Sequence, residues 1–306
     1  MPLQRPGLGI KVGDLIWAIG GQDLSSTILP QHTLAQQAGN SIPIVLSDAE
    51  GSNKRTVIVF PQSASKEPQW QYRQWVETNR QWVHQESQGK IGYLHIPDMQ
   101  TLGYSEFLRG YTQEFDRDGL IIDARYNGGG NLSYLMIDFL RRQRLGTDQT
   151  RHHGQFPYPS DAPKGPMVAL INEHTGSDGD IFAHAFKSYK MGALIGKRTW
   201  GGVVGIWPRY NLIDGTQTSQ PEFYFWFHDM GWSVENTGVS PTIEVDITPQ
   251  DYVQKKDPQL ERALKEALTS VENDAKRQGA LVPSQGSEPA LAAPKPKNSS
   301  LVHAGK

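Results

Sequence analysis

The sequence contains no cysteine, no long apolar run and no marked excess of one charge. Without cysteine there is no disulfide scaffold, no thiol nucleophile and no cysteine metal ligand, although this leaves the cellular compartment open. No stretch approaches the ~18 consecutive apolar residues that a membrane-spanning helix requires. The 30 basic and 32 acidic residues give a net charge of −2, which would attract neither nucleic acid nor an anionic membrane. We therefore expect no nucleic-acid partner and no membrane partner.

The chain is long enough for more than one domain. Its 306 residues correspond to about two domains of ~100–200 residues each, and 37% of them are hydrophobic. Apolar runs bounded by turn residues predict strands at Leu15–Ile19, Ile42–Leu46 and Thr56–Phe60. Residues 1–62 are therefore predicted to form a small β domain, with a short helix around Leu34–Ala38. Residues 273–306, rich in Pro, Ala, Ser and Lys, are predicted to form a disordered tail.

Strand patterns alternate with helix patterns between these parts, from residue 63 to 272. Strands are predicted at Ile91–Ile96, Gly119–Asp123, Met167–Asn172 and Ala193–Ile195, with further strands in the aromatic-rich stretch Tyr210–Val245. Helices are predicted at Pro68–Glu86, Tyr104–Arg117, Asn131–Arg142, Asp178–Tyr189 and Asp257–Val271. Such alternation is typical of βαβ units, so the fold class is α/β with a mostly parallel sheet.

A run of glycines follows one predicted strand, at the end where parallel sheets carry their functional groups. This is RYNGGG, Arg125–Gly130, directly after GLIID. Consecutive glycines let backbone N–H groups turn toward a ligand, so the run is compatible with a phosphate loop, a tight turn or an oxyanion donor. It is not a P-loop, because no Gly-Lys-Ser/Thr follows it.

Two further polar groups lie in comparable places. Ser177, in HTGSDGD, stands between a predicted strand and a predicted helix. It is either an ordinary N-cap or a nucleophile placed where the helix N-terminus would stabilise an oxyanion. Glu235, in VENTG, is either a solvated loop carboxylate or a group that orients another catalytic side chain.

Taken together, the motifs GLIIDARYNGGG, INEHTGSDGDIF, LIGKRTWGGVVG and VENTGVSP closely resemble the tricorn core protease family. This family is a branch of the C-terminal-processing-protease clan of serine peptidases, and the resemblance extends from about residue 1 to residue 270. It implies that residues 1–62 are the later portion of a PDZ domain. Residues 63–272 would then be the peptidase core.

The resemblance also implies roles for individual residues. Ser177 matches the nucleophile, and the backbone N–H groups of Gly130 and Asp178 match the oxyanion-hole donors. Glu235 matches the acidic member of the charge network. Asp148 falls where the family places a carboxylate that favours basic side chains at the cleavage site. Family subunits assemble into homohexamers, in which this aspartate would serve a neighbouring subunit.

The general base is expected outside this sequence. The processing branch pairs its serine with a lysine 25 positions downstream, but here position 202 is Gly. The tricorn branch uses a His that precedes the PDZ domain, and none of the nine His matches it. His84 and His95 are predicted to be structural, and His174 is predicted to point away from Ser177.

The sequence thus predicts a serine peptidase that hydrolyses short peptides through an acyl-enzyme at Ser177, with its catalytic His in an upstream segment. The isolated chain would be weakly active or inactive. No metal or organic cofactor is expected, because there is no HExxH and no clustered ligand set. The alternative is a catalytically incomplete fragment that binds peptides or supports assembly. A cytoplasmic location is expected, or a periplasmic one if a signal peptide lies upstream.

Overall fold

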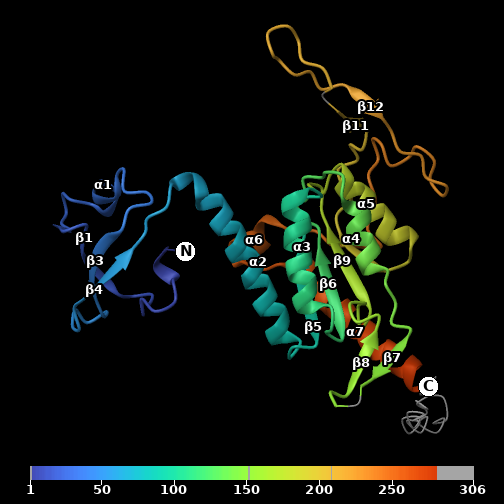
Figure 1. The fold of residues 1–306 in the computed structure, drawn as a ribbon, viewed down its shortest axis with the longest axis horizontal. Helices are drawn as coiled ribbons and strands as arrows, with labels where there is room; N and C mark the ends of the chain where they lie inside the picture. Colours follow the sequence, from blue (N-terminus) through green and yellow to red (C-terminus); the bar gives the residue numbers. More distant parts are fainter. Residues whose placement is uncertain (1, 151, 208, 281–306) are drawn as a thin grey trace, which may run out of the picture. The chain divides into compact units, whose positions relative to one another are not determined.

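The computed structural model describes residues 2–150, 152–207 and 209–280. The chain forms two compact units, Met1–Gln81 and Trp82–Lys306. The division falls inside the long helix α2 (Glu67–Glu86), later than the predicted boundary between residues 62 and 63 (Figure 1). No helix in the described part of the chain combines the length and the apolar character needed to cross a bilayer.

Unit 1 contains the small β structure predicted from its apolar runs. Its antiparallel sheet has the order β2-β1-β3-β4, formed by β1 (Leu15–Ile19), β2 (Gln22–Asp23), β3 (Ile42–Ser47) and β4 (Arg55–Val59). Successive residues of a strand face opposite sides of the sheet. Ile42, Ile44 and Leu46 of β3 are therefore buried together, and they pack with Ile19 and Val59.

The helical segments of unit 1 begin with η1 (Pro2–Gln4) and α1 (Pro30–Leu34). The prediction of a helix around Leu34–Ala38 is wrong. Pro30 suits the first turn because it lacks an N–H group, and Gln36 has a left-handed φ of 59°, which prevents the helix from continuing. A short turn, η2 (Ala64–Lys66), leads into α2, which has Pro68 in its first turn as predicted.

Unit 2 is built on a parallel sheet in the order β13-β10-β9-β6-β5 (Figure 1). Its strands are β5 (Ile91–His95), β6 (Gly119–Asp123), β9 (Met167–Ile171), β10 (Gly192–Gly196) and β13 (Ile243–Glu244). Every residue of β5, β6 and β9 is buried, as in strands that are covered on both faces. The predicted α/β core is confirmed.

Each strand of this sheet lies beside the preceding one in the chain, so every crossover moves in the same direction. Right-handed crossovers then place their helices on one face. These are α3 (Thr101–Glu114), α4 (Ser133–Leu140) and α5 (Asp178–Ser188). The other face is covered by α7 (Pro258–Ala280), which follows the short α6 (Pro249–Gln254) (Figure 1).

The core of unit 2 follows from this layering. On one face, Ile122 of β6 packs with Phe107 of α3 and Phe182 of α5. Its neighbour Ile121 is equally buried and points to the opposite face, where α7 contacts β6 and β9. The buried residues of α7 recur at the spacing of one helical stripe, Leu260, Ala263, Leu264 and Ala267.

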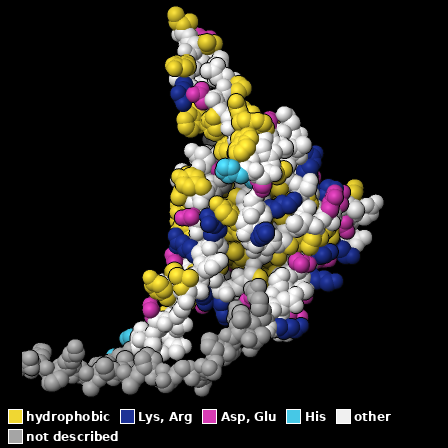
Figure 2. All heavy atoms as spheres, turned by 90° about the vertical axis from the view of Figure 1, so that its right-hand side faces the viewer, with side chains coloured by type: hydrophobic (Ala, Val, Ile, Leu, Met, Phe, Trp, Pro, Cys, Tyr) yellow, Lys and Arg dark blue, Asp and Glu magenta, His cyan; other side chains and the backbone are white. Residues whose placement is uncertain are grey.

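Two excursions leave this core. β7 (Gly146–Gln149) and β8 (Gln155–Tyr158) form a hairpin between α4 and β9. Residues 203–235, called the arm below, contain the paired strands β11 (Gly205–Ile206) and β12 (Pro221–Phe223). Figure 2 shows apolar side chains along the projecting part of the arm, where Tyr210, Trp226 and Trp232 are exposed. Within the described part of Tyr210–Val245, strand structure is limited to the short β12 and β13.

The C-terminal helix is longer than predicted. α7 continues to Ala280, so residues 273–280 are helical rather than part of a disordered tail. The remainder of that predicted tail, residues 281–306, lies outside the described residues.

Candidate active site

The carboxyl edge of the parallel sheet brings the glycine run and Ser177 side by side. The run follows β6 and Ser177 follows β9, and these strands are hydrogen-bonded neighbours. Asn127 joins the two loops, because its carbonyl accepts a bond from the Gly176 N–H (3.0 Å) while its Oδ1 accepts one from the Gly129 N–H (2.9 Å). Its Nδ2 donates to the Ile96 carbonyl (2.7 Å), which fastens both loops to the end of β5.

Glycine is required at Gly129 by the closeness of this contact. Its φ is 78°, and a Cβ there would lie 2.6 Å from the Cβ of Ser177 and 2.8 Å from the Gly176 carbonyl oxygen. At Gly128, by contrast, an added Cβ would meet no atom within 4 Å. The run is therefore a close junction between two loops rather than a flexible connection.

Ser177 has a backbone conformation that is rare for a residue with a side chain. Its φ is 55° and its ψ is −119°, outside the regions that most non-glycine residues adopt. It stands at the N-cap position of α5, but its side chain makes no capping hydrogen bond, so the interpretation as an ordinary N-cap is wrong. The residue is partly exposed, and its hydroxyl has no hydrogen-bond partner among the described residues.

Two backbone amides near this hydroxyl are free. The N–H groups of Gly130 and Asp178 donate no hydrogen bond within the described part of the chain. The ladder from Met99 uses the Gly129 carbonyl and the Asn131 N–H, and so leaves out the Gly130 N–H between them. Asp178 opens α5, where the helix dipole adds partial positive charge. Such amides can stabilise an oxyanion.

The side chain of Asp178, unlike its backbone amide, forms hydrogen bonds within the described part of the protein. Its carboxylate accepts bonds from the N–H (2.9 Å) and the hydroxyl (2.6 Å) of Ser133, the first residue of α4. Burial raises the pKa of this carboxyl, and the bonds from Ser133 oppose that rise. The carboxylate thereby ties the start of α4 to the start of α5, which fixes the direction of the neighbouring amide.

Glu235 closes the base of the arm. Its Oε2 accepts hydrogen bonds from the N–H groups of Val203 (2.7 Å) and Val204 (2.8 Å). One carboxylate therefore joins the first and the last residues of the arm. The next residue, Asn236, donates its N–H to the Gly201 carbonyl (2.7 Å). Among the described residues, Oε1 of Glu235 makes no hydrogen bond, and it can accept one from another group.

Asp180 belongs to the site, although sequence analysis did not single it out. It is fully buried, its Oδ1 accepts a bond from the Gly201 N–H (2.9 Å), and its Oδ2 has no partner in the described chain. Burial raises the pKa of this carboxyl and the charge of Glu235 adds to the rise, against the effects of Thr199 and of the Gly201 and Ser177 amides. The Ser-x-x-Asp spacing, which resembles a capping box, is the signal that would have found it.

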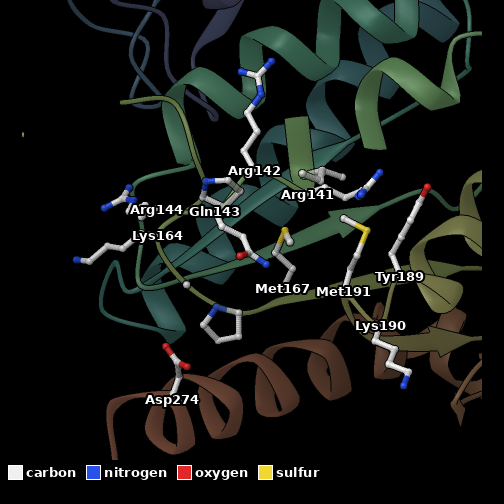
Figure 3. A pocket seen from close by; sticks show the side chains of 14 residues that line it. Arg141, Arg142, Gln143, Arg144, Lys164, Met167, Tyr189, Lys190, Met191 and Asp274 are labelled. Atoms are coloured by element: carbon white, nitrogen blue, oxygen red, sulfur yellow. The ribbon is translucent and has the colours of Figure 1, made fainter. Parts of the chain in front are cut away.

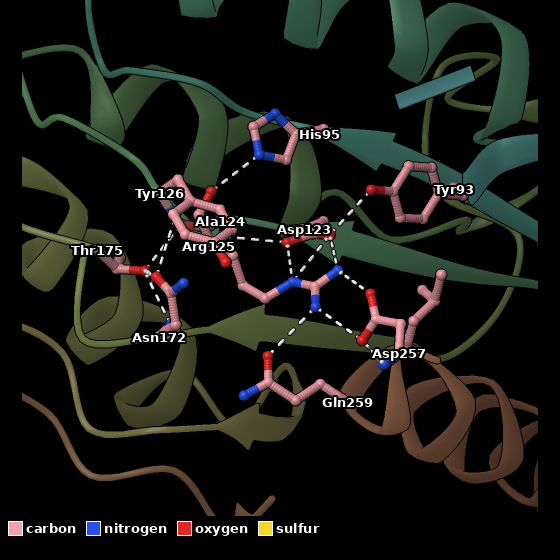
Figure 4. Close-up of polar contacts among 11 residues, drawn as sticks. Tyr93, His95, Asp123, Ala124, Arg125, Tyr126, Asn172, Thr175, Asp257 and Gln259 are labelled. Carbon is pink, nitrogen blue, oxygen red and sulfur yellow. Dashed lines mark hydrogen bonds and ion pairs between the residues drawn. The ribbon is translucent and has the colours of Figure 1, made fainter. Parts of the chain in front are cut away.

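An ion network surrounds Arg125, the buried first residue of the RYNGGG segment (Figure 4). The Arg125 guanidinium pairs with Asp123 (2.7 Å) and Asp257 (2.9 Å), and it donates a hydrogen bond to Gln259 (3.2 Å). Burial alone would lower the pKa of Arg125, but the two carboxylates raise it above its usual value. Because Asp257 also accepts a bond from the Leu260 N–H, the network joins the end of β6 to the start of α7.

No described histidine hydrogen-bonds the Ser177 hydroxyl. His84 pairs with a buried glutamate at 2.9 Å, and His95 contacts a backbone carbonyl at the start of the glycine run (2.9 Å). Burial lowers the pKa of His95. His174 is exposed and stacks on Tyr126 with ring centroids 5.5 Å apart.

The sequence lacks the lysine of a serine–lysine pair at position 202, and the structure crowds that position. A Cβ on Gly202 would lie 2.4 Å from the ring of Trp200, so this position does not accept a lysine without displacing the indole. Lys197 is paired with Glu244 (2.9 Å), and Lys190 follows the far end of α5.

The structure places Asp148 away from Ser177. It is exposed on β7, in the hairpin at the amino edge of the sheet (Figure 1). A five-residue strand such as β9 spans about 17 Å, so the sheet separates this hairpin from the Ser177 loop. In the described part of the chain, no group of three or more His, Cys, Asp or Glu side chains is arranged to hold a metal ion.

A hollow of about 730 Å³ also lies at the amino edge, away from Ser177 (Figure 3). The basic side chains in its lining are Arg141, Arg142, Arg144, Lys164 and Lys190. Arg144 and Lys164 are ion-paired with aspartates, and Arg141 lies over the ring of Tyr189. Cations suit this place because the negative C-terminal ends of α4 and α5 meet here. We interpret the hollow as structural.

Comparison with known proteins identifies the family. Residues 90–245, just over half of the chain, match peptidase family S41, and residues 1–63 match the tricorn protease PDZ domain. The chain therefore belongs to peptidase family S41.

Individual relatives confirm the resemblance to tricorn proteases. A tricorn protease homolog of Saccharolobus solfataricus is 45% identical over 87% of this chain and 24% of its own length. The tricorn protease of Thermoplasma acidophilum is 44% identical over 85% of this chain and 24% of its own length. A crystal structure of tricorn protease aligns with a TM-score of 0.80 at 44% identity, covering 87% of this chain and 26% of that one. The chain thus spans about a quarter of the length of these relatives.

Proposed function

We propose that this chain carries the nucleophile and the oxyanion hole of a tricorn-type serine peptidase that hydrolyses short peptides. The observation that carries the proposal is the presentation of Ser177, whose left-handed backbone places it at the start of α5 against Gly129. A strained serine at a strand-to-helix turn is how nucleophile elbows expose a hydroxyl. The free amides of Gly130 and Asp178 are the matching donors for a developing oxyanion.

In the proposed reaction, the Ser177 Oγ attacks the carbonyl carbon of the scissile amide and its proton passes to a general base. The carbonyl oxygen becomes an oxyanion held by the amides of Gly130 and Asp178. Collapse of this intermediate breaks the C–N bond, and the base returns the proton to the leaving amine. Water then attacks the acyl-enzyme, which releases the acid and restores the serine.

The general base is proposed to be a His supplied from outside this chain. In support, no described His contacts the Ser177 hydroxyl, while Oε1 of Glu235 makes no hydrogen bond and can accept one from an imidazole. A relative from Sulfurisphaera tokodaii, 44% identical over 89% of this chain, is described as a putative tricorn-like protease C-terminal subunit. Without the added His, the chain is expected to be weakly active or inactive.

Substrate selection is proposed to involve two further parts of the molecule. Asp148 would attract basic side chains at the cleavage site of a neighbouring subunit in a homo-oligomer, because its hairpin lies at the opposite edge of the sheet from Ser177. The β sheet of unit 1 ends in β4, whose outer edge is available for strand addition by a peptide. Strand addition uses main-chain hydrogen bonds and therefore needs little sequence information.

A second candidate is a catalytically incomplete chain that binds peptides or supports assembly. The observation that favours it is the Ser177 hydroxyl, which has no base among the described residues.

The experiment that separates the two candidates uses the chain alone and the chain produced together with its upstream coding sequence. For the peptidase, a fluorophosphonate labels Ser177 faster when the upstream segment is present, and Ser177→Ala lowers peptide turnover by at least about 1,000-fold without loss of binding. For the binding fragment, Ser177→Ala changes neither property.

A further inference from the structure

The indole of Trp200 lies close to Gly176, the residue that precedes the nucleophile. A Cβ on Gly176, the residue before Ser177, would be 2.9 Å from Cε3 of Trp200, and a Cβ on Gly202 would be 2.4 Å from Cζ3. The backbone N–H of Trp200 also donates to the Thr175 carbonyl (2.9 Å). The ring therefore lies against glycine backbone beside the Ser177 turn.

Much of the Trp200 side chain is exposed to solvent. Trp200 is 65% exposed although its backbone is bonded to the loop after β9. Among the described residues it makes no ring contact, no cation–π contact and no side-chain hydrogen bond. Two other exposed aromatic residues differ in this respect: Tyr189 lies under a guanidinium and Trp226 packs on Trp232. An exposed indole beside the nucleophile is suited to bind a flat or apolar group.

A bound peptide would pass this ring. Its scissile carbonyl must point toward the amides of Gly130 and Asp178, on the side of Ser177 where Gly129 makes contact. An extended peptide advances about 3.3–3.6 Å per residue, so a neighbour of the cleaved bond lies within reach of an indole that contacts Gly176.

We propose that Trp200 is a specificity-determining residue that receives an apolar side chain of the peptide at a position adjacent to the cleaved bond. This inference rests on the proposed peptidase function and adds to it a preference independent of charge. Burial of the substrate side chain against the open face of the ring supplies the preference.

The first test measures binding without turnover. The 306-residue chain carrying Ser177→Ala is titrated by calorimetry with short Ala-based peptides that contain one Lys and a single Phe at each remaining position in turn. We expect one Phe position to bind about tenfold more tightly than Ala. Adding Trp200→Ala should reduce that preference below about twofold, whereas Trp200→Phe, which keeps a ring, should retain most of it.

The matched control is Tyr189→Ala, which removes an exposed aromatic ring at the opposite end of α5. It should leave the peptide preference unchanged. The proposal is overturned if no Phe position is preferred, if the preference survives Trp200→Ala, or if Tyr189→Ala abolishes it equally.

The second test uses hydrolysis by the chain produced with its upstream segment. Trp200→Ala should raise KM for the preferred Phe peptide about tenfold and leave kcat within about threefold, because the ring contributes binding rather than chemistry. Loss of kcat at unchanged KM would contradict the proposal. Failure of the peptidase function itself gives a different result, namely turnover that does not depend on Ser177, and the binding measurement does not depend on that outcome.

Discussion

At Gly129 the structure has no room for a methyl group, because the loop of Ser177 lies too close. Gly129→Ala places a Cβ 2.6 Å from the Cβ of Ser177 and forces alanine to a φ of 78°. We expect a loss of about 1–3 kcal/mol in the free energy of unfolding and slower labelling of Ser177 by a fluorophosphonate, by about tenfold or more. Urea denaturation and labelling kinetics measure the two effects.

The control for this change is the preceding residue. Gly128→Ala introduces the same methyl group where no atom lies within 4 Å and where φ is not in the left-handed region. Its unfolding free energy and labelling rate should stay close to those of the wild type. Equal effects of the two substitutions would show that the glycine run acts through flexibility and not through close approach.

Asp180 gives the site a dependence of stability on pH. Its folded-state pKa is above the usual value of 3.8, so ionisation opposes folding, and the stability it contributes falls as pH rises from 3.8 through the folded pKa. Asp180→Asn removes this titration and keeps an oxygen for the Gly201 N–H. The unfolding free energy of the variant relative to wild type should therefore increase between about pH 4 and pH 7 in urea titrations.

The exposed residue Asp214 serves as a comparison, because its pKa is shifted in the opposite direction. The Thr216 N–H donates to Asp214 and lowers its pKa, so ionised Asp214 favours the folded state. Asp214→Asn should therefore leave the difference from wild type flat between about pH 4 and pH 7, and lose its disadvantage relative to wild type only as the pH falls below 3.8. A flat difference for Asp180→Asn would mean that this carboxyl is not perturbed by burial.

At the scale of elements, the network around Arg125 links β6 to α7. Arg125→Met leaves Asp123 buried without its cation, and removing one partner of a buried ion pair costs about 3–5 kcal/mol. Glu244→Ala removes an exposed pair with Lys197 and should cost far less, because solvent screens exposed pairs. Chemical denaturation measures the loss of unfolding free energy in each variant. Similar losses would contradict the assignment of the network as a structural link.

The arm is the element whose conformation the sequence left undetermined. Its aromatic residues gave strand-like patterns, yet β11 has only 2 residues and β12 only 3. Short strands are stable only where they pair and pack, and most aromatic side chains of the arm are exposed rather than packed on a core. Its geometry at the base comes from the Glu235 carboxylate, a contact that joins residues more than thirty positions apart.

At the scale of the whole molecule, the position of Asp148 predicts complementation between subunits. In the presence of the upstream segment, Ser177→Ala chains and Asp148→Ala chains should each cleave Lys-containing peptides poorly. Mixed assemblies combine an intact Ser177 with a neighbour's intact Asp148 at about a quarter of the sites, so about a quarter of wild-type turnover should return.

The measurement is peptide turnover after the two variants are dissociated and reassembled together. Mixing without dissociation serves as the control and should give only the sum of the separate rates. The same sum after reassembly would rule out a role for Asp148 in a neighbour's site.

The sequence by itself determined the α/β layering, because strand and helix periodicities are local properties of the chain. It also marked Ser177, Glu235 and the glycine run, since glycines and polar residues at strand ends remain visible without a structure. Only the tertiary structure decided that Ser177 is strained and uncapped, that Gly129 touches it, that Asp180 accepts a bond from Gly201, and that Trp200 lies beside Gly176. These features depend on contacts between loops distant in sequence, and no local pattern encodes such distances.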